Sequence, residues 1–277
     1  MLIDYHVHVE RAGPSRENMM RFVRQAQSVG VDEIAFTEHA YNFVELAPLL
    51  PRPSFLADHG HGFELDDYLT LVGQVADELK EQGAPITVRT GLEVDFLPEM
   101  HHELGKILPG LEVDLIIGSV HWIDDWGFDL GKSTWDGRDS EQACTRYFEI
   151  AAEAARSGLF SVIGHPDIIK IYGLTADERC RAATSRGAGV LVKAAAASGA
   201  CLEVSSAGLR RPVGEIYPSM EILRMARHHD VGITMASDAH EPHEVGKDLG
   251  EVAKWARRAG YDEITRFSRR RKIQSAL

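Results

Sequence analysis

The feature that most constrains the fold is a repeated alternation of short apolar segments, typical of strands, with longer amphipathic segments, typical of helices. The expected strands lie at residues 2–5, 33–36, 86–92, 113–118, 160–164, 201–205 and 231–235. The expected helices lie near residues 15–29, 64–82, 99–107, 140–157, 176–198, 216–229 and 244–259. A helix between two strands returns the chain to the same end of the sheet, so such strands run parallel. Seven alternations indicate an α/β fold with a parallel barrel, although periodicity alone also permits an open, doubly wound sheet.

Start and stop signals support several of these helices. Ser15 precedes one helix, Asp139 or Ser140 opens another, and Pro218 with Ser219 is expected in a first turn. Glycines stand where helices should end, at positions 30, 83, 158, 199 and 260.

The chain shows no linker rich in serine, proline or glycine, so we expect residues 1–277 to form a single domain. The longest irregular stretch, residues 41–63, has a length typical of a functional lid. We interpret its two histidines, His59 and His61, as solvated loop residues. The tail, residues 266–277, carries a basic cluster and is expected to be a solvated, frayed end.

Charge and targeting signals restrict the partners and the compartment. Thirty lysines and arginines oppose forty-two aspartates and glutamates, giving a net charge of −12, which disfavours nucleic-acid and membrane-surface binding. The N-terminus lacks the build of a signal peptide, and no apolar run is long enough to span a membrane. Cys144, Cys180 and Cys201 lie far apart, so we expect three free thiols in the cytoplasm.

The thirteen histidines provide the main functional signal. His6 and His8 follow the first expected strand with a spacing of two, which places both side chains on one face of an extended chain. The other candidates, at the ends of further expected strands, are His39, Glu93, His121, His165, Asp238 and His240. The C-terminal ends of parallel barrel strands meet at one rim, so these residues predict a metal site. Nitrogen and carboxylate ligands without cysteine suit Zn, Mn or Fe, and eight of them exceed the needs of one ion.

The motifs HVH, TEH, GLE, SVH, GHPD and SDAH, in that order, resemble the signature of the PHP (polymerase and histidinol phosphatase) family of metal-dependent phosphoesterases. The resemblance runs from residue 1 to about residue 250. It implies a distorted, TIM-like (β/α)7 barrel with two to three divalent metal ions. It also implies three ligand sets: His6, His8, Glu93 and Asp238; Glu93, His121 and His165; and His39 with His240.

One departure from the family pattern concerns the third ion. Many members with three metals have another histidine a few residues after the HxH pair, but residues 9–14 contain none. The third site is therefore expected to have two histidines, or to be completed by Glu10 or solvent.

The stretch SSAGLRRPVGEIYPS at residues 205–219 is similar to a segment of the histidinol-phosphate phosphatases within this family. Its Arg210 or Arg211 is expected to bind phosphate, with Arg16 as a second clamp, because a guanidinium offers paired donors and keeps its charge. The implied reaction is the hydrolysis of L-histidinol phosphate, a small anionic phosphomonoester. Acidic candidates for its cationic part are Glu45, Asp58, Glu64 and Glu215.

In the expected mechanism Glu93 bridges two ions, Asp238 accepts the proton of the attacking water, and His240 or another histidine of the rim protonates the departing alkoxide. Three alternatives remain open at this point. They are a phosphoesterase for nucleotides or nucleic acid, a C–N hydrolase of the amidohydrolase type, and a non-catalytic module that metal ions stabilise.

Overall fold

The computed structural model describes residues 1–175 and 177–277. Seven parallel strands of this part of the chain form one sheet in the order β1-β2-β3-β4-β7-β8-β9. They are β1 (Ile3–Val7), β2 (Glu33–His39), β3 (Thr87–Asp95), β4 (Leu115–Ser119), β7 (Val162–Ile163), β8 (Cys201–Ser205) and β9 (Ile233–Ala236). Consecutive strands of the chain are therefore neighbours, which contradicts the doubly wound alternative.

The sheet closes between its first and last strands. The His8 amide donates to the Ala239 carbonyl at 2.8 Å, and the Ala239 amide donates to the His6 carbonyl at 3.1 Å. Val7 and Ala239 form a parallel bridge at this point. The sequence-based prediction of a distorted (β/α)7 barrel is confirmed.

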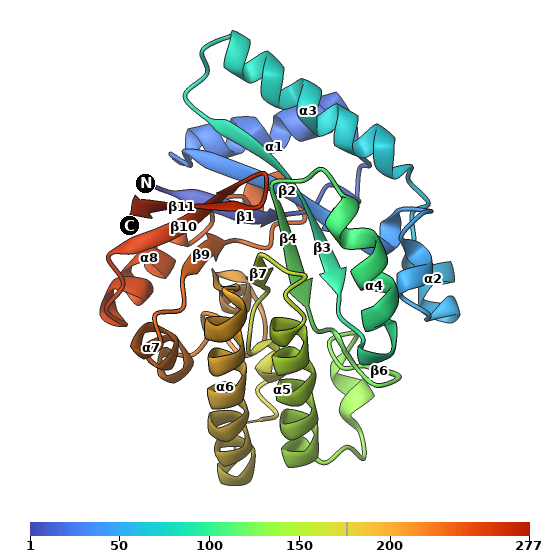
Figure 1. Cartoon of the computed structure of the whole chain (residues 1–277), viewed down its shortest axis with the longest axis vertical. Coiled ribbons are helices and arrows are strands. Elements are labelled where there is room, and N and C mark those ends of the chain that lie inside the picture. Colours follow the sequence, from blue (N-terminus) through green and yellow to red (C-terminus); the bar gives the residue numbers. More distant parts are fainter. Residues whose placement is uncertain (176) are drawn as a thin grey trace.

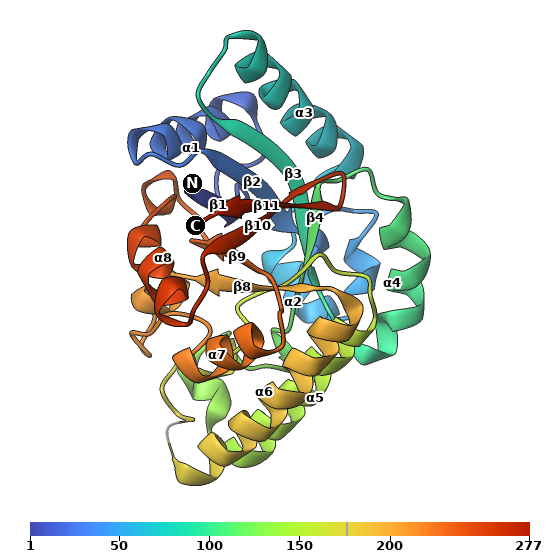
Figure 2. The ribbon, with the colours of Figure 1, turned by 60° about the vertical axis from the view of Figure 1, so that its left-hand side comes forward.

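The helices cover the outside of the barrel (Figures 1 and 2). They are α1 (Arg16–Ser28), α3 (Leu65–Glu81), α4 (His101–Ile107), α5 (Ser140–Arg156), α6 (Glu178–Ser198), α7 (Met220–His228) and α8 (Leu249–Arg258). Ser15 and Asp139 cap α1 and α5 by accepting hydrogen bonds from backbone amides, as the sequence predicts. The expected start of a helix at residue 176 lies outside the described residues. The helix expected from residue 216 begins only at Met220, because Tyr217 pairs with Ser205 in an antiparallel bridge.

Residues 41–63 contain more regular structure than the sequence suggested. They hold most of the 3₁₀ turn Ala40–Asn42, a second turn at Ala47–Leu49, and the short helix α2 (Pro53–His59). Leu50 of this stretch packs against Leu97 and Trp122, and Trp122 belongs to the small hairpin of β5 (Trp122–Ile123) and β6 (Trp126–Gly127). Apolar contacts therefore hold the stretch beside the C-terminal ends of the strands.

The expectation of a frayed tail is wrong. The chain ends in an antiparallel hairpin, β10 (Glu263–Ser268) and β11 (Arg271–Ala276), which buries Ile264 and Phe267. Arg266 of this hairpin lies 3.0 Å from Glu33, a buried carboxylate at the start of β2. The basic residue pairs with a charge inside the molecule, so the hairpin closes the N-terminal end of the barrel. Both termini lie on this side (Figure 2).

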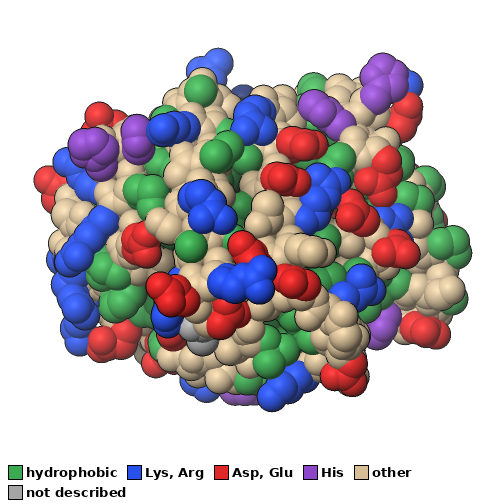
Figure 3. Space-filling view, turned by 90° about the horizontal axis from the view of Figure 1, so that it is seen from below, with side chains coloured by type: hydrophobic (Ala, Val, Ile, Leu, Met, Phe, Trp, Pro, Cys, Tyr) green, Lys and Arg blue, Asp and Glu red, His purple; other side chains and the backbone are tan. Residues whose placement is uncertain are grey.

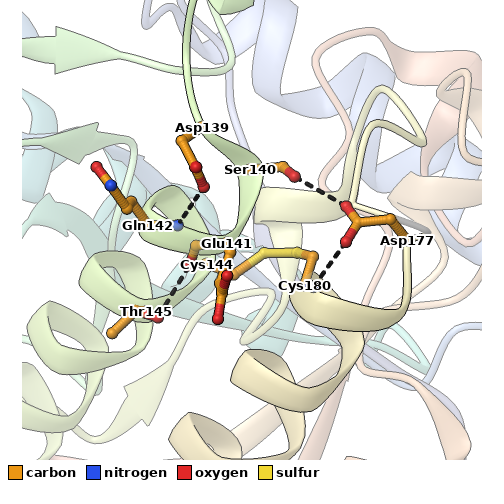
Figure 4. Close-up of a disulfide and its surroundings, with 8 residues drawn as sticks. All are labelled: Asp139, Ser140, Glu141, Gln142, Cys144, Thr145, Asp177 and Cys180. Atoms are coloured by element: carbon orange, nitrogen blue, oxygen red, sulfur yellow. Dashed lines mark hydrogen bonds between the residues drawn. A yellow bond between two sulfur atoms is a disulfide. The ribbon is translucent and has the colours of Figure 1, made fainter.

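The expectation of three free thiols is also wrong. Cys144 near the start of α5 and Cys180 near the start of α6 form a disulfide, whereas Cys201 is free and buried (Figure 4). The two helices lie side by side, which brings residues separated by 36 positions to a Cα–Cα distance of 6.1 Å. Beside the disulfide, the Ser140 hydroxyl donates to Asp177, the residue that caps α6. The starts of the two helices are thus joined by a covalent bond and a hydrogen bond.

Across the described residues, no helix combines the length and the apolar character that a membrane crossing requires.

We predict that the replacement of Cys144 by serine lowers the free energy of unfolding by about 2–4 kcal/mol, because the unfolded chain loses a cross-link. Denaturant titration measures this change. Thiol titration of the denatured, unreduced protein should detect one thiol per chain, and Cys201→Ser should reduce that signal to zero. Detection of three thiols would contradict the disulfide.

Candidate metal centre

The eight predicted ligands converge at the C-terminal end of the barrel. His6, His39 and Glu93 lie within β1, β2 and β3, and the other five follow the ends of strands. The register of β2 with β3 pairs His39 directly with Glu93. The rings of His39 and His240 lie 4.1 and 4.4 Å from that of His8. Residues from the two ends of the chain thus share one cluster.

Backbone conformation contributes to this convergence. Asp238 has φ of 56° and His165 has φ of 23°, values that side-chain-bearing residues rarely adopt. Such conformations persist where the surrounding structure imposes them, and they are concentrated at functional sites. The sharp turns after β7 and β9 bring these two residues into the cluster.

Glu93 lies at the centre of the cluster. Its Oε1 is 3.2 Å from Nε2 of His6 and 3.2 Å from Nε2 of His165. Its Oε2 is 2.6 Å from Nδ1 of His39. The two oxygens of one carboxylate therefore face two different groups of histidines, as a bridging ligand requires.

Buried polar atoms that face one another without a well-formed hydrogen bond provide a test of whether metal ions fit. Nε2 of His6, Nε2 of His8, Nδ1 of His39 and Oε2 of Glu93 are such atoms within the described residues. Such atoms are costly unless something compensates for the lost solvation. Among the described residues, four groups have ligand atoms within 4.8 Å of one another: His6, Glu93 and His165; His6, His8 and Asp238; His8, His39 and His240; and His8, Glu10 and Glu38. The residues present fit divalent ions that prefer nitrogen and oxygen ligands.

The structure also places the candidate that the sequence left open for the third site. Oε1 of Glu10 lies 3.8 Å from Nε2 of His240. Glu10 also groups with His8 and Glu38 at ligand distances. A carboxylate thus stands beside His8 and His240 at this part of the cluster.

Sequence reasoning missed a layer of buried carboxylates behind the histidines. Nδ1 of His6 lies 2.7 Å from Oε2 of Glu203, and Nδ1 of His121 lies 2.9 Å from Oδ1 of Asp95. Glu38 accepts a hydrogen bond from the Val9 amide at 2.8 Å. Carboxylates in this position fix the ring orientation and tautomer of metal-ligating histidines. Their signal in the sequence is an acidic residue inside an otherwise apolar strand.

The electrostatics of the cluster favour cations. Burial alone would raise the pKa of Glu93, but His6, His39 and His121 lower the pKa well below its ordinary value. Burial lowers the pKa of His8, yet Asp238 and Glu38 raise the pKa to about 10. The carboxylates thus stabilise positive charge on the rings. A divalent cation can satisfy the same carboxylates while the histidines stay neutral.

The three arginines predicted to bind phosphate lie in different surroundings. Arg211 lines a cavity of about 220 Å³ that reaches the cluster. Arg210 instead donates to the carbonyl of Ser237 at 2.6 Å and supports the turn that carries Asp238. Arg16 is exposed and pairs with Glu78 at 2.7 Å, away from the cavity. Of the three, Arg211 is therefore the one that the structure brings to the cavity.

Aromatic residues form the other wall of this cavity. Tyr41, Phe55, His59 and Trp122 line it, and the rings of Phe55 and His59 are 4.6 Å apart. His59 is exposed, as expected, but it ends the helix α2 instead of lying in a loop, and it also lines the cavity. The cavity thus joins a charged side with a side that suits a flat ring.

A family model described as the PHP domain matches residues 4–207, which is most of the chain. The chain belongs to the PHP domain family. The family prediction is therefore confirmed, and the ligand cluster of this PHP chain coincides with the motifs on which the prediction was based.

Curated relatives match this PHP chain over nearly its whole length. A probable histidinol-phosphatase from Deinococcus radiodurans is 30% identical over 275 residues, covering 99% of this chain and 98% of the relative. A histidinol-phosphatase from Bacillus subtilis is 26% identical over 265 residues, covering 88% of this chain and 95% of the relative.

A solved structure has the same fold as this PHP chain. It is the histidinol phosphate phosphatase of Lactococcus lactis in complex with zinc, L-histidinol and phosphate. The TM-score is 0.79 at 21% identity, with 98% of each chain covered.

We predict that Glu203→Gln weakens metal binding by about 10–100-fold, because the amide no longer holds the Nδ1 of His6 as a carboxylate does. Competition with a chromogenic chelator measures the affinity, and circular dichroism checks the fold. Glu78→Gln is the matched control, since Glu78 pairs with Arg16 outside the cluster. Equal affinities of the two variants would show that Glu203 has no such role.

Proposed function

We propose that this PHP chain is a metal-dependent phosphomonoesterase that hydrolyses L-histidinol phosphate to L-histidinol and phosphate. The observation that carries this proposal is the cavity in which the cluster of histidines and carboxylates meets Arg211 and an aromatic wall. Full-length relatives named histidinol-phosphatase support the choice of substrate. Alternatives with a nucleotide substrate or C–N hydrolysis lack support of this kind.

The proposed ligands fall into three sets around the bridging residue Glu93. His6, His8, Glu93 and Asp238 would hold one ion, and Glu93, His121 and His165 a second. His39 and His240, with Glu10 nearby, would hold a third. Bound divalent ions would polarise the phosphate and lower the pKa of water so that a nucleophile exists near neutral pH. Zinc is the ion named with the Lactococcus lactis enzyme, and the ligands also suit manganese or iron.

The protein's own residues supply binding and proton transfer. Arg211 would bind the oxygens of the phosphate through its paired donors. Asp238 is ionised, because His6 and its other histidine neighbours overcome the effect of burial and lower its pKa, so its carboxylate can accept the proton of the attacking water. Burial lowers the pKa of His240. His240 is then neutral and can protonate the leaving alkoxide only with a proton that it has first received.

The remaining expectations concern partners and location. Acidic and basic side chains are interspersed over most of the face of the molecule in Figure 3, and the absence of a nucleic-acid partner stays a prediction. The absence of a membrane partner and the cytoplasmic location stay predictions. The Cys144–Cys180 disulfide bears on the location, because a reducing compartment opposes it.

We expect the purified, metal-loaded protein to hydrolyse L-histidinol phosphate with a kcat/KM at least about 100-fold above that for p-nitrophenyl phosphate, since binding contacts beyond the phosphate stabilise the transition state. Phosphate release measures both rates. Glu93→Ala, purified in parallel, should be inactive on both substrates and controls for contaminating phosphatases. Equal kcat/KM values for the two substrates would contradict a specificity for L-histidinol phosphate.

We predict that Arg211→Ala raises the KM for phosphomonoesters by about 10–100-fold, because a charge-assisted contact to the phosphate is lost. Inhibition by inorganic phosphate should weaken by a similar factor, which separates phosphate binding from effects on the leaving group. Arg24→Ala, an exposed position on α1, is the matched control. An unchanged KM and an unchanged inhibition constant would exclude Arg211 from the phosphate site.

A further inference from the structure

Asp129 is an acidic residue of the cavity wall that belongs to none of the motifs behind the predicted metal site. It lies after β6 and lines the cavity together with Trp122 and Arg211. The Tyr172 hydroxyl donates to the backbone carbonyl of Asp129, which fixes the residue in place. Its Oδ1 is buried and forms no hydrogen bond within the described part of the chain.

The metal cluster does not use this carboxylate. Asp129 belongs to none of the groups whose atoms lie at ligand distances, and the Nδ1 of the nearby His121 is occupied by Asp95. Burial raises the pKa of Asp129, and the opposing effect of His121 is smaller. A half-buried carboxylate with a buried oxygen that forms no hydrogen bond is unfavourable unless a cation compensates for it. Because Asp129 lines the cavity, a cationic group of a molecule bound there can supply this charge.

The other acidic residues that line the cavity are already engaged. Among the described residues these are Glu93, Asp95 and Asp238, and each lies beside histidines of the cluster. The four acids suggested by the sequence do not line the cavity. Glu45 accepts a hydrogen bond from the Leu65 amide, and Glu215 pairs with Lys170, while Asp58 and Glu64 are exposed.

We propose that Asp129 binds the ammonium group of the substrate and thereby selects phosphomonoesters that carry an amine close to the phosphate. This inference rests on the proposed function, which it deepens by naming the residue that recognises the organic part. Asp129 is then a specificity-determining residue.

The charge state of the two nitrogen groups favours the amine over the imidazole. An aliphatic amine is a full cation at neutral pH, whereas an imidazole with an ordinary pKa near 6.5 is largely neutral. A buried carboxylate gains most from a full charge. The imidazole, a flat and weakly polar ring, suits the wall formed by Tyr41, Phe55 and Trp122. The cavity thus offers a separate surface to each of the three groups of an imidazole-bearing amino-alcohol phosphate.

The test compares Asp129→Asn with the wild-type protein on L-histidinol phosphate and on its desamino analogue, in which hydrogen replaces the amine. The wild type should prefer the amine by at least about 30-fold in kcat/KM, the size expected for a desolvated charge pair. Asp129→Asn should lose that preference and keep its efficiency on the desamino analogue within about threefold. Asp125→Asn, an exposed acid in the same segment, is the matched control and should behave like the wild type.

Three results would overturn the inference. They are an equal loss on both substrates, an unchanged preference for the amine, and a loss confined to substrates that carry the imidazole. Phenylalaninol phosphate, which keeps the amine and replaces the imidazole, identifies the last case. Metal analysis and circular dichroism of Asp129→Asn show whether an equal loss reflects altered metal binding or folding.

The same data separate this inference from the proposed function. If the wild type hydrolyses L-histidinol phosphate no better than p-nitrophenyl phosphate, the proposed function fails. Phosphoethanolamine and ethyl phosphate then replace the substrate pair, and a preference for the amine that Asp129→Asn abolishes still supports the inference. If the wild type is specific and Asp129→Asn is unchanged, the inference alone fails.

Discussion

The contact between the first and the last strand of the barrel is the interaction on which the site depends. Backbone hydrogen bonds join His6 and His8 to Ala239, so the HxH motif and the SDAH motif form adjacent strand ends. Asp4 strengthens this junction, because its carboxylate accepts hydrogen bonds from the Ser237 amide and hydroxyl at 2.8 and 2.6 Å. In an open sheet, β1 and β9 would be opposite edges, and His8 could not lie beside His240. Barrel closure is thus a condition for the metal centre as well as for the fold.

Much of this architecture is accessible from the sequence because it depends on local order. Apolar periodicity locates the strands, and the placement of polar residues at their ends locates the ligands, since parallel strands end on the same side. His39 and Glu93 illustrate the point, because the pairing of two consecutive strands is enough to bring them together. The order of the motifs then indicates the PHP family, and membership in this family implies a closed barrel.

The features that the sequence did not reveal depend on contacts between distant segments. Glu203 contacts His6, which lies 197 positions away in the sequence. A single acidic residue in an apolar strand does not indicate which histidine ring it contacts. From the sequence, Arg266 cannot be distinguished from a charged residue of a solvated tail. Only the fold of the hairpin brings it to Glu33. Cys144 and Cys180 become partners only through the packing of α5 on α6. Asp129 differs from its exposed neighbour Asp125 only in the surroundings that the fold gives it.

The terminal hairpin affects the route by which small molecules reach and leave the metal centre. β10 and β11 cover the N-terminal end, where Arg266 pairs with Glu33, and buried side chains fill the barrel, so the described residues leave the cavity on the metal side as the route to the cluster. An ester that binds with its phosphate on the cluster places that group at the bottom of this cavity and its organic part at the mouth. After cleavage, the alcohol obstructs the exit of the phosphate. On the proposed function, this geometry predicts an order of departure, in which the alcohol leaves first and the inorganic ion leaves last.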